Sequence, residues 1–222
     1  TAVGVLNSVF QQNANDGPNA ATGVFVTGSP ATTPAETPNL IQGNTFQLNT
    51  NSPEPADLSM SAVILVQESA VDIFSNVFTG NTDESVITIH NQETTPLNDA
   101  VVNVYSNLIF NNATSGPVVS LDPAPRFRFT NNTVVGHTLG GAYTLYQGIL
   151  TRGGFDAQGD PFGAPRDVAG SQWDIRNNIF FNNADFGTPA FDATDTSGCA
   201  SLEGGQDNGA RVNWIFNSGS VN

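Results

Sequence analysis

The sequence contains no lysine, a single cysteine and few charged residues of any kind. Its six basic residues are all arginines and stand against 20 acidic residues, so the 222-residue chain has a net charge of −14. Such an acidic chain repels nucleic acid and anionic membrane surfaces, and we expect neither as a partner. The lone Cys199 excludes an internal disulfide. The longest apolar run, Ala62 to Val66, is too short to cross a bilayer, so no membrane insertion is expected.

Charged residues make up only 12% of the chain, whereas glycine, asparagine, threonine and serine are abundant. This composition suits a chain that turns often and has few long solvated helices, so it favours an all-β fold. The hydrophobic content of 38% is sufficient for one continuous core. Without disulfides, stability must come from the packing of the chain against itself.

One sequence unit recurs through the chain around an asparagine. Apolar residues lie five and three positions before it, a further apolar residue lies two positions after it, and a polar residue lies five positions after it. Around Asn76 these positions hold Val71, Ile73, Phe78 and Asn81. Asn7, Val9 and Gln12 form a weaker first unit. The six anchors are Asn7, Asn44, Asn76, Asn107, Asn132 and Asn178.

Alternation of apolar residues before the anchor indicates a strand with one buried face, and the step to asparagine indicates a bend before a second short strand. Another β-rich stretch follows about ten residues after three of the anchors, at 86–89, 118–121 and 142–145, and more distantly after the first two, at 24–26 and 63–66. The pattern therefore predicts a right-handed parallel β-helix solenoid of six to seven coils, with three short strands per coil.

Asparagine at the bend has a physical explanation. It tolerates left-handed backbone conformations, and its amide can both donate and accept hydrogen bonds. We therefore predict that the six anchors stack as an asparagine ladder. His137 occupies the slot that asparagine fills five residues after other anchors, and we expect it to make the same hydrogen bonds.

These units resemble the parallel β-helix repeats of the pectate-lyase-like superfamily over nearly the whole chain. The Phe-x-x-Asn spacing at 10–13, 46–49, 78–81, 129–132 and 180–183, with Gly140-Gly-Ala-Tyr143, is also similar to polymorphic outer-membrane autotransporter passengers. The resemblance implies a secreted or cell-surface protein. We expect one domain over residues 1–222, complete or as a segment of a longer solenoid, with loop insertions at 29–39 and 147–172.

Enzymes with this fold use clustered carboxylates, or acids that hold Ca²⁺ beside a basic residue. Asn81-Thr-Asp83 resembles the first motif of polygalacturonase-like glycosidases, but the motifs that would complete it do not occur in the sequence. We assign no catalytic residue and no metal or cofactor. Weak surface contacts with Ca²⁺ are open to isolated acids, namely Asp16, Asp83, Glu84 and Asp192.

The 147–172 insertion is the best candidate for a binding site, because loops on a rigid scaffold commonly carry binding. Aromatic rings there could stack on sugars while arginines contact carboxylates or hydroxyls. The alternative is a loop that merely covers one side of the helix. The candidate ligand-binding residues are Tyr143, Tyr146, Arg152, Asp156, Asp160 and Arg166.

Two functions follow from these expectations. The first is a non-enzymatic extracellular structural or adhesive protein, whose partners are further β-helix coils or copies of itself stacked head to tail in filaments. The second is a polysaccharide lyase or glycoside hydrolase that acts near the 147–172 insertion. Equal offsets in successive units hold asparagine and apolar residues rather than acids and a base, which favours the first.

Overall fold

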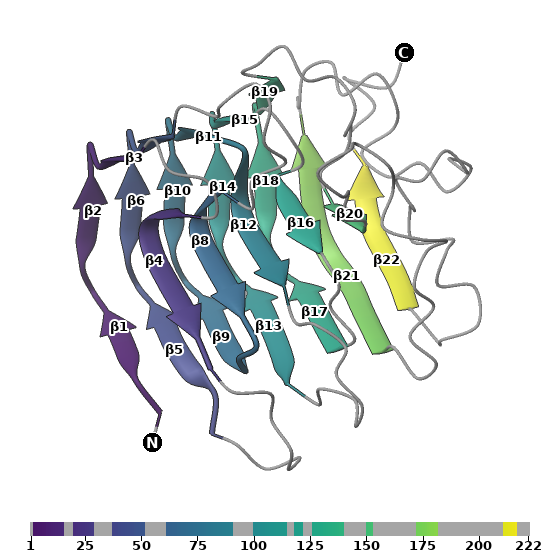
Figure 1. The fold of residues 1–222 in the computed structure, drawn as a ribbon. Helices are drawn as coiled ribbons and strands as arrows, with labels where there is room; N and C mark the ends of the chain where they lie inside the picture. The colour runs from purple at the N-terminus through teal and green to yellow at the C-terminus, as the bar shows by residue number, and fades with distance from the viewer. Residues whose placement is uncertain are drawn as a thin grey trace, which may run out of the picture.

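The computed structural model shows an all-β chain whose strands form three parallel sheets (Figure 1). It describes residues 2–15, 20–28, 37–51, 61–90, 100–114, 118–121, 126–139, 150–152, 172–181 and 211–216. In these ranges there is no helix, and hence none that is long and apolar enough to cross a membrane. The prediction of an all-β chain with stacked parallel strands is confirmed.

The first sheet contains two columns of short strands that follow each other along every turn of the chain. The first column runs through β1 (Gly4–Leu6), β5 (Asn39–Gln42), β9 (Val71–Phe74), β13 (Val101–Tyr105) and β17 (Arg126–Thr130). The second column runs through β2 (Val9–Gln11), β6 (Thr45–Gln47), β10 (Val77–Thr79), β14 (Leu108–Phe110) and β18 (Thr133–Val135). The longer β21 (Gln172–Phe181) pairs with the last strand of both columns, and β22 (Arg211–Phe216) pairs with β21.

The other two sheets each take one strand from every turn. The second sheet consists of β3 (Ala14–Asn15), β7 (Thr50–Asn51), β11 (Thr82–Asp83), β15 (Ala113–Thr114) and β19 (Thr138–Leu139). The third sheet consists of β4 (Ala21–Thr27), β8 (Ala62–Gln67), β12 (Ser85–His90), β16 (Val119–Leu121) and β20 (Leu150–Arg152).

One turn of the stack consists of four strands, which belong in chain order to the first column, the second column, the second sheet and the third sheet. The first five turns follow this order, and the strands of each turn pair with the equivalent strands of the next. The predicted strands on either side of the asparagine and the later β-rich strand are present. A further strand of two residues, which belongs to the second sheet, lies between them. In the fifth turn the third-sheet strand is β20, whereas the predicted stretch 142–145 lies outside the described residues.

The alternation in β9 places Val71 and Ile73 in the core and turns Asp72 and Phe74 outward. By contrast, β8 is buried along Ala62–Val66, on both of its faces. Strands buried on both faces have continuous apolar sequences, which explains the apolar run noted in the sequence.

Aromatic rings stack in the core under the second column. The ring centroids of Phe10 and Phe46 are 4.8 Å apart, and those of Phe46 and Phe78 are 4.9 Å apart, with nearly parallel planes. Phe46 and Phe78 are fully buried. Burial of one such side chain contributes about 1.5–3 kcal/mol, so the stack is a major source of stability for the first three turns.

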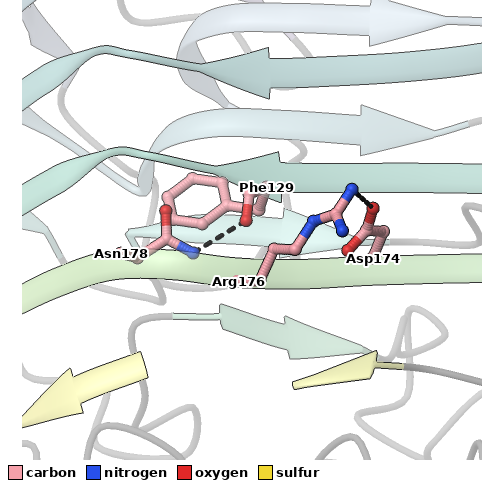
Figure 2. Close-up of polar contacts among 4 residues, drawn as sticks. All are labelled: Phe129, Asp174, Arg176 and Asn178. Carbon is pink, nitrogen blue, oxygen red and sulfur yellow. Dashed lines mark hydrogen bonds and ion pairs between the residues drawn. The ribbon is translucent and has the colours of Figure 1, made fainter. Parts of the chain in front are cut away.

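Five asparagines at the bend between the two columns form a hydrogen-bonded ladder, namely Asn44, Asn76, Asn107, Asn132 and Asn178. The backbone N–H and the side-chain Nδ2 of Asn76 both donate to Oδ1 of Asn107, each at 3.0 Å. Nδ2 of each asparagine also donates to a backbone carbonyl of the neighbouring turn; Figure 2 shows this bond from Asn178 to Phe129, at 2.7 Å. The amides of Asn44, Asn76, Asn107 and Asn132 thus join their own turn to the turns on both sides, and Asn178 joins its turn to the preceding one.

A second ladder lies five residues further along each turn. It joins Asn13, Asn49, Asn81 and Asn112 by the same pair of bonds to Oδ1 of the next asparagine. His137 takes the following position, where its Nε2 lies 3.1 Å from the Ile109 carbonyl oxygen. Nδ2 of Asn112 makes the equivalent bond to Phe78, so His137 occupies the ladder position and has one of the contacts expected of it.

The first turn differs from the sequence prediction by one residue. The backbone N–H of Ser8, and not of Asn7, donates to Oδ1 of Asn44 at 2.8 Å. Asn7 lies one position earlier, in the left-handed region with φ of 49°, where the next turn has Gly43. The register pairs Phe10 with Phe46, which turns Phe10 inward and leaves Val9 exposed. The equivalents of the predicted Val9 and Gln12 are therefore Phe10 and Asn13.

Replacing Asn107 by alanine should lower the free energy of unfolding by about 1–3 kcal/mol, because the buried donors of Asn76 lose their acceptor. Chemical denaturation of both proteins measures the difference. Gln47→Ala, on the outer side of β6, is the matched control and should change stability much less. Equal stability of the Asn107 variant and the parent would contradict a structural role for the ladder.

Candidate functional site

Most of the predicted ligand-binding residues lie outside the described part of the chain: Tyr143, Tyr146, Asp156, Asp160 and Arg166. Arg152 is the last residue of β20, where it pairs with Leu121. The 147–172 insertion therefore contains a strand of the third sheet. The described surface offers two other candidates, and both lie on the outer side of the first sheet.

The first candidate is the outer side of the first column, which we call the polar strip. In β5, β9, β13 and β17 its side chains alternate with buried residues, and together with residues of β21 they form two rows across the turns. One row holds Leu40, Asp72, Asn103, Arg128 and Asp174, and the other holds Gln42, Phe74, Tyr105, Thr130 and Arg176.

Most polar-strip side chains are engaged with each other. Nδ2 of Asn103 donates to Asp72 at 2.6 Å, and Arg176 forms an ion pair with Asp174 at 2.7 Å (Figure 2). The rings of Phe74 and Tyr105 stack with centroids 4.7 Å apart. Burial and the nearby charge of Asp72 raise the pKa of Tyr105. Since the two rings cover each other, the faces between them are not open to a sugar.

The second candidate is the outer side of the second column, which we call the uncharged face. It comprises the outward residues of the second column and of the end of β21, with the bends that flank them. These lie within the segments 7–13, 43–51, 75–82, 106–114, 131–139 and 177–181. None of the segments contains aspartate, glutamate, lysine or arginine. The face is therefore free of formal charge on a chain whose net charge is −14.

Aliphatic and hydroxyl side chains occupy the central row of the uncharged face. The row consists of Val9, Thr45, Val77, Leu108, Thr133 and Ile179. Val9 is 64% exposed, Leu108 40% and Ile179 45%. These three exposed residues come from the first, fourth and sixth turns, and partly buried Thr45, Val77 and Thr133 complete the row. Exposed apolar side chains gathered on a face without charge favour it as a contact surface, so this face is the stronger candidate.

Asp83, which the sequence suggested as a surface acid, is instead 3% exposed. It pairs with Thr114 in the second sheet, and its side chain therefore points inward. Burial raises the pKa of Asp83 to about 7, although its carboxylate accepts hydrogen bonds from the Glu84 backbone N–H (2.9 Å) and from the Thr22 hydroxyl (3.0 Å). Asp83 is therefore a core residue and is not placed for a surface Ca²⁺ contact.

The described residues contain no group of three or more histidine, cysteine, aspartate or glutamate side chains that could hold a metal ion. No family model matches the chain, and no curated protein or solved structure is significantly similar to it. Its function must therefore be inferred from its own surfaces.

The substitution Asp83→Asn should stabilise the protein relative to the parent, and this gain should be larger at pH 8 than at pH 4. Below about pH 4 Asp83 is protonated both folded and unfolded, but between pH 4 and 7 only the unfolded chain releases the proton, so the parent loses stability as pH rises. At about 1.4 kcal/mol per pKa unit, the variant should gain several kcal/mol over the parent by pH 8. Denaturation curves at both pH values measure this gain. Asp72→Asn, which removes one carboxylate from the polar strip, controls for net charge; an equal gain there would contradict the role of burial.

His137→Asn should have the opposite pH dependence. Burial lowers the pKa of His137 to about 4, so between pH 6.5 and 4 the unfolded chain takes up a proton that the folded chain does not, and the parent loses stability as pH falls. Asparagine keeps a ladder amide without this proton. The variant should therefore gain stability over the parent from pH 7 to pH 4.5 in denaturation experiments. A constant difference across this range would exclude His137 as the source.

Proposed function

We propose that this chain is a right-handed parallel β-helix of the pectate-lyase-like kind and serves as extracellular structural or adhesive surface material. The uncharged face carries the proposal. Along the second column, equal positions of successive turns hold ladder asparagines and core residues inside and uncharged side chains outside. A rigid stack that repeats one flat surface is suited to contact with another extended surface.

The rigidity has two sources that act at the same place. The two ladders flank the second column, with Asn76 before β10 and Asn81 after it. Under the same column lies the ring stack of Phe10, Phe46 and Phe78. The backbone of the uncharged face is thus fixed at both ends and from below, so binding there orders little additional chain.

Head-to-tail stacking into filaments belongs to the same proposal. Among the described strands, β1 to β4 pair only with the strands of the second turn. The other edges of these strands are able to pair with a further β-helix coil, either of the same protein or of another copy. Electron micrographs of the protein at high concentration test this part, because long fibres are expected and dispersed particles would contradict it.

Adhesion predicts that the dilute protein is retained on an insoluble extracellular polymer through the uncharged face. Cellulose, chitin and calcium-pectate particles offer neutral and acidic polysaccharide surfaces, and the protein left in the supernatant after sedimentation measures retention. Leu108→Lys should abolish retention, because it places a charge at the centre of the face. Leu40→Lys, which adds the same charge to the polar strip, should leave retention unchanged.

The same incubations test the alternative, a polysaccharide lyase or glycoside hydrolase with its site near residues 147–172. New reducing ends or unsaturated products in the supernatant would favour the enzyme over the structural protein. Absence of retention on every polymer, or equal retention of both lysine variants, would contradict adhesion through the uncharged face.

A further inference from the structure

We propose that the uncharged face pairs laterally with the uncharged face of a second copy of this chain. This inference goes beyond adhesion to a foreign surface, because it names the chain itself as the partner and a side of the stack, rather than its ends, as the contact. It rests on the charge, the shape and the area of the uncharged face.

Charge restricts where two copies can meet. Each copy has a net charge of −14, so most approaches bring like charges together. The polar strip carries partly or fully exposed charged groups that would have to lose water on contact, such as Asp72, Asp174 and Arg176. The uncharged face lets two copies touch without desolvating a formal charge, and its Val, Leu and Ile side chains gain from burial.

The shape suits a contact between two sheets. The strands β2, β6, β10, β14 and β18 lie side by side in one parallel sheet (Figure 1). Residues within an outward row repeat at about 4.8 Å, and neighbouring rows lie about 6.6 Å apart along the strands, so the side chains of one copy can fit between the rows of the other, with the sheets about 10 Å apart. A two-fold axis along the stack would place the Leu108 region of one copy against that of the next.

The area predicts that one such contact is weak. Six strand positions at about 4.8 Å, and about six residues at about 3.3 Å across, give a surface of about 29 by 20 Å, or roughly 570 Å² per copy. Two copies would bury about 1,100 Å², which is below the roughly 1,200–2,000 Å² of stable interfaces and within the range of weak, transient ones. Pairing is therefore expected at high protein concentration, or where copies are held together and the effective concentration is high.

Sedimentation velocity of the intact chain, from micromolar to millimolar concentration and in 0.05 M and 1 M NaCl, tests the proposal. The parent should shift from monomer to dimer as concentration rises, and the shift should occur at lower concentration in 1 M NaCl, because salt screens the repulsion between copies. Val77→Lys and Leu108→Lys should each weaken dimerisation about tenfold or more. Leu40→Lys, which reduces the net negative charge equally, should not weaken it.

Thermal unfolding of each variant shows whether it is folded, and the two lysine positions serve as independent checks on each other. The proposal is overturned if the parent remains monomeric at millimolar concentration in both salts, or if both face variants dimerise as the parent does. Fibres that persist in these variants would indicate contact through the ends instead. Retention on a polysaccharide that is lost in Leu108→Lys, without dimerisation of the parent, would leave adhesion standing and exclude the second copy as the occupant.

Discussion

The stacked asparagine amides determine the rest of the structure, because they fix the register between neighbouring turns. Asn107 accepts two bonds from Asn76 and donates both to Asn132 and to the Ile73 carbonyl, so a shift of one residue would break several bonds at once. A strand shifted by one residue also turns its buried side chains outward. The phenylalanine stack inside and the uncharged face outside are therefore two consequences of one register. This is also why turns with loops of different length can still present equal surfaces.

The sequence reveals the ladder because its asparagines recur at fixed offsets from alternating apolar residues, and this spacing was sufficient for five of the six anchors. It fails in the first turn, where Asn7 stands at the left-handed bend and Ser8 at the ladder position. Asparagine suits both positions, so its identity does not distinguish them. The inward Phe10 does, because it aligns with Phe46. The two-residue strands of the second sheet could not be predicted, since two residues show no periodicity.

The candidate surface was harder to predict than the fold. Titratable and aromatic residues, such as those near 147–172, can be recognised in a sequence as candidates for a binding site. The uncharged face is instead defined by its lack of charged residues. The residues that form this face stand at the first and third positions after each ladder asparagine, for example Val77 and Thr79 after Asn76. These positions can be recognised as neighbours only once the turns are aligned in register. Asp83 shows the reverse error, because an acid in a polar segment proved to be a core residue.

Burial in the core shifts the pKa of Asp83 up and the pKa of His137 down. Each is buried in the state that avoids charge, and their opposite pH dependences partly cancel between pH 4 and 7. The outer surface, by contrast, carries formal charges, and these act between copies of the chain. A net charge of −14 keeps dilute copies apart, while the uncharged face leaves one direction of approach without this repulsion. Because the attraction is short-ranged and the repulsion is screened by salt, the ionic strength and the local density of copies would decide when they pair. The proposed role as surface material would require this combination, since copies would have to remain separate until they are brought close together.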